Sequence, residues 1–92
     1  MMTPQVVRRF RTTKSFDKEY DTLPQKIKKK TKKAFSNLKD NFSHPSVRAR
    51  IHNKEKKIWE GRVDREYRFT FTLVGDILQL RHIGNHDIYR NP

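Results

Sequence analysis

The sequence ends in a segment whose side chains could carry out chemistry, IGNHDIY from Ile83 to Tyr89. His86, Asp87 and Tyr89 bring an imidazole, a carboxylate and a phenol within four positions of one another. These groups titrate or form hydrogen bonds, whereas the ends of chains are ordinarily tolerant of change. The cluster is therefore either accidental or part of a site.

Arginines on two predicted strands supply a second candidate chemistry, the binding of an anion. Opposed residues of an antiparallel pair share one face of the sheet, so apolar residues must oppose apolar residues. This rule pairs Trp59 with Phe71 across a three-residue loop centred on Arg65. The same register predicts that Arg62 lies beside Arg68 on the opposite face of the sheet.

The next hairpin extends this arginine face. The dipeptide Gly75-Asp76 is a turn signal. Its register places Arg81 opposite Thr70, on the same face as the other two arginines, and places His82 opposite Phe69 in the core. Arginine forks match the geometry of phosphate, so we expect this face to bind an anion. The alternative is that half-exposed strands commonly carry arginine on their solvated face.

A first helix is predicted by the spacing of apolar residues that precede these strands. Phe16, Tyr20 and Leu23 recur at helical intervals. Thr13 or Ser15 can cap the start of this helix.

A second helical pattern follows the sequence TLPQ, in which Thr22–Gln25 has the spacing of a capping box, and ends before Pro45. Its outer side carries the run KIKKKTKK, so Lys28, Lys29 and Lys32 are candidate contacts for RNA phosphates. They would bind through charge without reading bases. The alternative is a solvated helix face, where lysine runs are common.

From residue 47 the apolar period changes to two, which predicts antiparallel strands. A short first strand near residues 6–11 precedes the helices. This order of elements predicts an α+β fold, with a two-helix hairpin packed on one face of a small, mainly antiparallel β-sheet. The 92 residues have the length of a single domain, residues 1–92.

Composition limits the class of protein. Lys and Arg number 22 against 10 Asp and Glu, and the net charge of +12 favours a polyanionic partner over a merely lysine-biased surface. The chain has no cysteine, which excludes a disulfide scaffold, a thiolate zinc site and a cysteine nucleophile. It lacks an apolar run of membrane-spanning length, so we expect a soluble, cytoplasmic protein without a membrane partner.

The segment IWEGRVDREYRFTFTLVGDILQLRHIGNHDIY, from Ile58 to Tyr89, resembles the RelE/ParE toxin superfamily, particularly its RelE, YoeB and YafQ-like mRNA endonucleases. The more specific parts are W-x-x-R-V-x-x-x-Y-R, which begins at Trp59, and the terminal I-G-N-H-D-I-Y. The resemblance implies a toxin that cleaves mRNA on the ribosome and is neutralised by a cognate antitoxin, which we expect to be acidic. It also implies cleavage without a metal or cofactor, with the ribose 2′-hydroxyl as nucleophile.

The resemblance also implies roles for individual residues. Arg68 matches the arginine that stabilises the phosphate, and Arg62 matches a neighbouring basic position. His86 matches the acid that protonates the 5′-oxygen, and Tyr89 matches an aromatic residue that positions the substrate. The general base is open, with Glu66 and Glu60 as candidates. Further nucleic-acid contacts are expected from Arg48, Arg50, Arg65 and Arg81.

Two other classes of function remain. One is a ParE-like inhibitor of DNA gyrase, against which the terminal His86 and Tyr89 argue, because a pure binder needs no acid there. The other is a non-catalytic module that binds RNA or the ribosome through its lysines and arginines.

Overall fold

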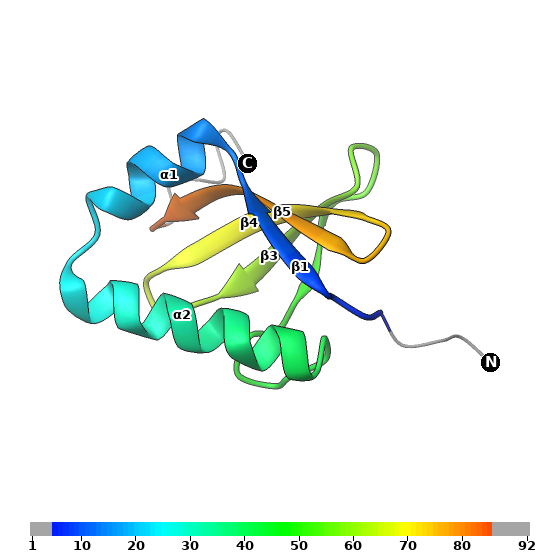
Figure 1. The fold of residues 1–92 in the computed structure, drawn as a ribbon, viewed down its shortest axis with the longest axis horizontal. Coiled ribbons are helices and arrows are strands. Elements are labelled where there is room, and N and C mark those ends of the chain that lie inside the picture. Colours follow the sequence, from blue (N-terminus) through cyan, green and yellow to red (C-terminus); the bar gives the residue numbers. More distant parts are fainter. Residues whose placement is uncertain (1–4, 86–92) are drawn as a thin grey trace.

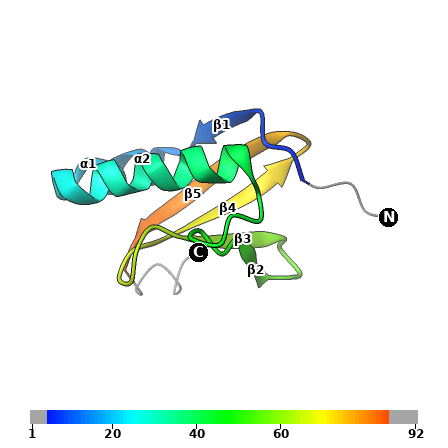
Figure 2. The same ribbon diagram turned by 90° about the horizontal axis from the view of Figure 1, so that it is seen from below.

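The computed structural model describes residues 5–85 of the chain. Its strands form one five-stranded sheet in the order β1-β5-β4-β3-β2, in which β1 runs parallel to β5 and the other neighbours are antiparallel. Both helices lie on one side of this sheet (Figures 1 and 2). The predicted α+β architecture is therefore confirmed. The elements are β1 (Arg9–Thr12), α1 (Lys14–Asp21), α2 (Gln25–Asp40), β2 (Arg50–Asn53), β3 (Ile58–Arg62), β4 (Arg68–Val74) and β5 (Ile77–Gly84).

The start of α1 is tied to the sheet through its cap. The Thr13 hydroxyl oxygen accepts a hydrogen bond of 3.2 Å from the Phe16 N–H, as an N-cap residue does. The same hydroxyl donates to the carbonyl of Arg81 at 3.0 Å. The cap therefore fixes both the first turn of α1 and its position beside β5 (Figure 1).

The predicted capping box at the start of α2 is wrong. Thr22 instead closes α1, and its hydroxyl donates to the carbonyl of Glu19 at 2.8 Å. Pro24 is the N-cap of α2 and offers no side-chain hydrogen bond. The short connection leaves Thr22 committed to the end of the first helix, so it cannot also cap the second.

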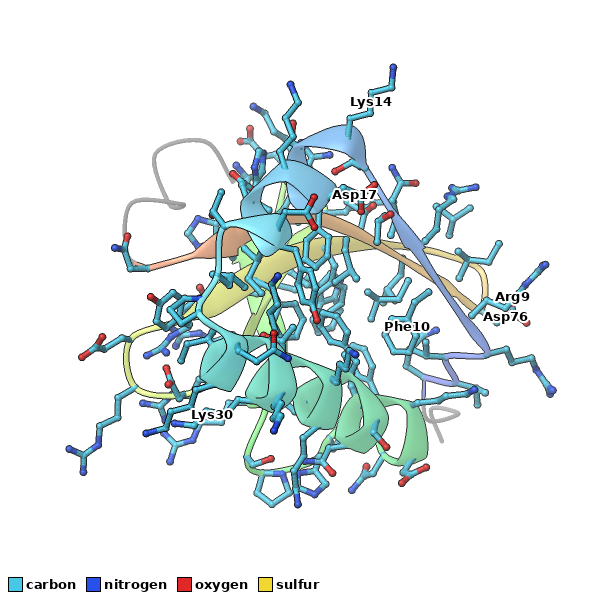
Figure 3. All side chains as sticks on the ribbon, turned by 60° about the vertical axis from the view of Figure 1, so that its left-hand side comes forward. Arg9, Phe10, Lys14, Asp17, Lys30 and Asp76 are labelled. Carbon is cyan, nitrogen blue, oxygen red and sulfur yellow. The ribbon has the colours of Figure 1, made fainter. Side chains whose placement is uncertain are left out.

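The core forms where α2 packs on the sheet. Buried positions recur along α2 at intervals of three and four residues, from Ile27 to Leu38, as an amphipathic helix requires. Phe35 packs edge to face on Phe69 of β4, with ring centroids 5.1 Å apart. Phe10 of β1 stacks on the same Phe35 at 5.4 Å, and Figure 3 shows it directed into the interior. Aromatic contacts therefore join the two layers.

The predicted register of β3 and β4 is confirmed. Trp59 opposes Phe71, and Arg62 opposes Arg68. Between these pairs Gly61 opposes Phe69, whose ring lies so close that a Cβ on Gly61 would collide with its ring carbons. Only glycine fits beneath this ring.

The register of β4 and β5 matches the prediction only near the turn. Gly75 has φ +61, a conformation that favours glycine, and Phe71 opposes Leu80 as predicted. A bulge then shifts the pairing, so that Thr70 opposes His82 and Phe69 opposes Ile83. The predicted partners of Thr70 and Phe69 are therefore wrong.

The bulge has a physical cause in the spacing of apolar residues on β5. Leu80 and Ile83 are both buried, yet three positions separate them, and strict alternation would turn one of them outward. An extra residue in the strand restores both to the core. Arg81 therefore lies at the bulge, and His82 leaves the core face.

Candidate functional site

A hollow of about 440 Å³ lies beside the arginines of β3 and β4. Its walls come from β3, from the first residue of β4, and from β2 with the segment before it. Four of the lining residues are arginines and one is a carboxylate, so the hollow suits an anion. The lining residues are Val47, Arg48, Ala49, Arg50, Glu60, Gly61, Arg62 and Arg68.

Arg62 and Arg68 form a cationic pair on the face of the sheet turned away from the core. They oppose each other directly across β3 and β4. The Arg62 backbone N–H donates to the carbonyl of Val47 at 2.7 Å, which anchors the segment before β2 against β3. Like charges at opposed positions repel, so an anion between them would stabilise the pair.

The Arg68 guanidinium is held by the loop between β3 and β4. Its Nη1 donates to the carbonyls of Asp64 and Tyr67, the latter at 3.1 Å. Asp64 in turn orders this loop, because its Oδ1 accepts from the N–H groups of Glu66 and Tyr67 at 2.9 Å each. Asp64 also pairs with Lys30 of α2 at 3.4 Å.

These contacts lower the pKa of Asp64. Burial raises the pKa of its carboxyl, but the hydrogen bonds from the backbone of Tyr67 and Glu66, together with Lys30, outweigh it. The net pKa therefore lies below the ordinary value of 3.8. Asp64 remains ionised at neutral pH and keeps the loop closed around Arg68.

Glu60 is the carboxylate of the hollow. Its side chain is only 7% exposed, forms an ion pair with Arg50 Nε, and lies 3.6 Å from His52 Nδ1. Glu66, the other base candidate from the sequence, is exposed and does not line the hollow. The structure thus brings Glu60 together with Arg62 and leaves Glu66 outside.

Thr70 lies beside Glu60 in the sheet, opposite it on β4. Its side chain is fully buried, and its hydroxyl is the single buried side-chain polar atom of residues 5–85 without a hydrogen-bond partner. Buried hydroxyls are ordinarily paired, so this one carries an energetic cost.

Arg48 enters the hollow from a left-handed backbone conformation. Its φ is 52°, and its N–H donates to the carbonyl of His44 at 3.2 Å. A residue with a Cβ is disfavoured there, at a cost of about 1–3 kcal/mol. The tight turn from His44 to Arg48 thus places an arginine in a backbone conformation that glycine ordinarily adopts.

Other predicted contacts lie elsewhere. Arg65 is exposed in the β3–β4 loop, and Arg81 at the bulge does not line the hollow. Lys28 Nζ lies 5.6 Å from the centre of the Tyr20 ring, a cation–π contact within the helical hairpin. Lys29 and Lys32 are exposed on α2. Two further predicted residues, His86 and Tyr89, lie outside the described residues.

A second hollow, of about 180 Å³, lies between α2 and the end of β3. We did not expect it from the sequence, although Lys30, Lys33 and Asn37 have the i, i+3, i+7 spacing that places residues on one side of a helix. Figure 3 shows Lys30 extending from α2 on the side of the β3–β4 loop. Its lining residues are Lys30, Lys33, Ala34, Asn37, Ser46, Arg62 and Val63.

The described part of the chain shows neither a metal-binding cluster nor a membrane-spanning helix. Residues 5–85 contain no group of three or more His, Cys, Asp or Glu side chains placed to hold a metal ion. Neither α1 nor α2 has the length and apolar character that crossing a bilayer requires.

The fold is similar to the folds of solved YoeB, YafQ and RelE toxins, as expected from the sequence. The structure is similar to a YoeB/ParE toxin from Agrobacterium tumefaciens, with a TM-score of 0.71 and 16% identity over 86% of this chain and 99% of that one. It is similar to YafQ from E. coli, with a TM-score of 0.67 and 14% identity over 85% and 92% of the two chains. A chain of the RelB–RelE antitoxin–toxin complex from Methanococcus jannaschii gives a TM-score of 0.70 and 19% identity over 89% and 99%. No protein-family model matches the sequence, and a comparison with curated proteins finds no match.

Proposed function

We propose that this protein is the toxin of a toxin–antitoxin pair and acts in the cytoplasm as a ribosome-dependent endoribonuclease that cleaves mRNA without a metal ion. The observation that carries the proposal is the opposed pair of Arg62 and Arg68 at a hollow rich in arginine. The fold shared with RelE, YoeB and YafQ toxins supports it. A binder without catalysis needs cations but has less use for a buried carboxylate among them.

The arginines have two tasks in this reaction. Cleavage passes through a pentavalent phosphorane that carries more negative charge than the phosphodiester, so donors fixed beforehand stabilise it most. Arg68, held by two backbone carbonyls, serves as the principal clamp. Arg62 binds from the opposite strand, while Arg48 and Arg50 hold the flanking backbone of the RNA.

Proton transfer needs a base and an acid. Glu60 accepts the proton of the ribose 2′-hydroxyl, and the 2′-oxygen attacks the adjacent phosphorus. The bond from phosphorus to the 5′-oxygen then breaks, and His86 donates a proton to that oxygen, as the resemblance implies. The products are a 2′,3′-cyclic phosphate and a free 5′-hydroxyl, with Tyr89 positioning the substrate.

We also propose an acidic antitoxin as partner. Two of the similar structures are complexes of this kind, RelB–RelE from M. jannaschii and DinJ–YafQ from E. coli. A segment rich in Asp and Glu would offset the net charge of +12 and would reduce the repulsion between the arginines of the hollow. Co-expression with the neighbouring open reading frame and affinity purification test this partner. Recovery of the basic protein alone, harmless to cells, would contradict it.

Ribosome profiling after brief induction tests the activity. We expect cuts with codon periodicity inside translated mRNA. DNA damage without such cuts would indicate gyrase inhibition, and the absence of both would indicate a non-catalytic RNA-binding module. Either of these results would refute the proposed reaction.

A further inference from the structure

The second hollow presents hydrogen-bond donors and cations to any ligand. Lys30, Lys33 and Arg62 contribute cationic groups, and none of the residues that line it is acidic. Asp64 pairs with Lys30 at 3.4 Å from outside the lining and offsets part of its charge. Lys33 forms no ion pair with any residue of the range 5–85, so no carboxylate there offsets its charge.

A hydrogen-bond chain fixes how the polar wall is oriented. The Ser46 backbone N–H donates to His44 Nδ1 at 3.2 Å, so this nitrogen acts as an acceptor. The Ser46 hydroxyl lies 2.8 Å from the same nitrogen and can share this acceptor with the backbone N–H. Asn37 Nδ2 donates to the Ser46 oxygen at 3.3 Å and has a second N–H to offer. This N–H adds a donor to the cations of Lys33 and Arg62, and together they favour an anion.

The two hollows meet at Arg62, which lines both of them. We propose that the second hollow is a subsite for a further phosphate of the same RNA strand whose cleaved phosphate lies between Arg62 and Arg68. This inference rests on the proposed function. It specifies the path of the bound RNA strand, which leads from the arginine hollow past Arg62 to α2. A strand already bound in the first hollow presents its next phosphates at high effective concentration, so even a shallow second site gains occupancy.

The prediction separates Lys33 from its sequence neighbour Lys32. Both are exposed lysines of α2, but only Lys33 lines the second hollow. Lys33→Ala and Lys32→Ala remove the same charge from the same helix, so they form a matched pair. Both variants should melt like the wild type, because neither side chain is buried.

The experiment measures binding of 2′-O-methyl oligoribonucleotides, which lack the nucleophile and remain uncut, to the full chain over a range of salt concentrations. A dinucleotide analogue carries one phosphodiester, which we expect the first hollow to bind, whereas a tetranucleotide analogue carries two more that we expect to extend toward the second. Lys33→Ala should weaken tetranucleotide binding about fivefold and reduce the salt slope of its affinity by about 0.7. It should leave dinucleotide binding unchanged, and Lys32→Ala, which lies outside both hollows, should weaken tetranucleotide binding less than Lys33→Ala does. In ribosomal cleavage Lys33→Ala should raise KM and spare kcat.

The failure of this subsite is distinguishable from the failure of the proposed function. If Lys33→Ala and Lys32→Ala bind the tetranucleotide equally, the subsite is refuted while the arginine hollow stands. If Lys33→Ala weakens only the complex with an acidic protein partner, the hollow belongs to that partner and the subsite is also refuted. If the wild type binds neither analogue and cuts no translated mRNA, the proposed function itself is wrong.

Discussion

Arg68 is held by backbone carbonyls, and no carboxylate of residues 5–85 forms an ion pair with it. A carbonyl orients the guanidinium but leaves its charge uncompensated. The remaining N–H donors are therefore available to an incoming phosphate. This arrangement distinguishes Arg68 from Arg50, whose guanidinium already pairs with Glu60.

Arg68→Ala should lower single-turnover cleavage on saturating ribosomes about 100–1,000-fold, because it removes a donor to the transition state. His86→Ala should lower it to a similar extent if the histidine is the general acid. Both should bind ribosomes almost as the wild type does, because many other lysines and arginines hold the RNA. Wild-type cleavage by His86→Ala would exclude the C-terminal cluster from catalysis.

Asp64 acts on Arg68 through the loop, and two substitutions separate its charge from its hydrogen bonds. Asp64→Asn keeps an oxygen that can accept from the Glu66 and Tyr67 N–H groups, whereas Asp64→Ala does not. We expect the alanine variant to lose kcat and the asparagine variant to retain most of it. Equal loss in both would mean that the pair with Lys30, and not the loop, positions Arg68.

The pH dependence of stability follows from the lowered pKa of Asp64. The folded state binds the Asp64 proton less tightly than the unfolded state does. The ionised carboxylate therefore stabilises the fold at pH values above its ordinary pKa of 3.8. This contribution falls as the pH drops through the lowered pKa. The wild type should therefore melt at a higher temperature than Asp64→Asn at neutral pH, and this difference should disappear as the pH falls below the lowered pKa of Asp64.

Thr70 and Thr31 form a matched pair of buried hydroxyls. Thr31 donates to the carbonyl of Ile27 at 2.8 Å, while the hydroxyl of Thr70 has no partner within residues 5–85. Valine has nearly the same shape as threonine, so Thr70→Val should raise the free energy of unfolding by about 1 kcal/mol. Thr31→Val should lower it or leave it unchanged. Urea unfolding measures both, and a destabilised Thr70→Val would indicate that its hydroxyl is satisfied in solution.

At the scale of elements, the packing of Phe69 on Gly61 couples β3 to the core. Phe69 is fully buried and contacts Phe35 and Phe71, so its ring cannot retreat from an added methyl group. Strand β3, which contains Gly61, also carries Glu60 and Arg62 on its other face. A disturbance of this contact would therefore reach the arginine hollow.

Gly61→Ala should lower the free energy of unfolding by about 1–3 kcal/mol through overpacking. In the double variant, Phe69→Leu should offset part of this loss, because the smaller side chain makes room. Gly75→Asn is the control, since Gly75 has open space around it and asparagine tolerates its φ of +61. Chemical denaturation measures all four proteins, and a Gly61→Ala variant as stable as the wild type would contradict the close contact.

At the scale of the whole molecule, the proposed site is a shallow hollow with most of its charge on arginines. Such a surface would attract RNA through charge but would do little to force a strand into the geometry for in-line attack. The ribosome would supply this geometry by holding the mRNA, and proximity of that kind accounts for large rate factors.

We therefore expect rapid cleavage of ribosome-bound mRNA and poor cleavage of the same mRNA free in solution. Chelation of divalent ions should leave the chemical step unchanged once the ribosomes are kept intact, for example with polyamines. Equal rates on free and ribosome-bound RNA, or a strict requirement for a divalent ion in the cut itself, would refute this mechanism. Single-turnover assays on both substrates provide the test.

Local patterns in the sequence determined the helices and the central hairpin. The apolar spacing that ends at Leu38 marks the buried side of α2, and the alternation from Trp59 to Phe71 is sufficient to oppose Arg62 to Arg68. These features are local because one helix face or one tight hairpin contains all the residues that decide them.

Tertiary structure alone decided the features that depend on competition between distant groups. His82 and Ile83 compete for one core position, and the helices that bury Ile83 also place Glu19 against the His82 ring at 3.1 Å, so a bulge breaks the simple alternation. Glu60 rather than Glu66 lines the hollow because the cross-strand pair with Arg50 holds it there. Lys33 lies beside Arg62 only because α2 crosses the end of β3, and no spacing along the sequence encodes that crossing.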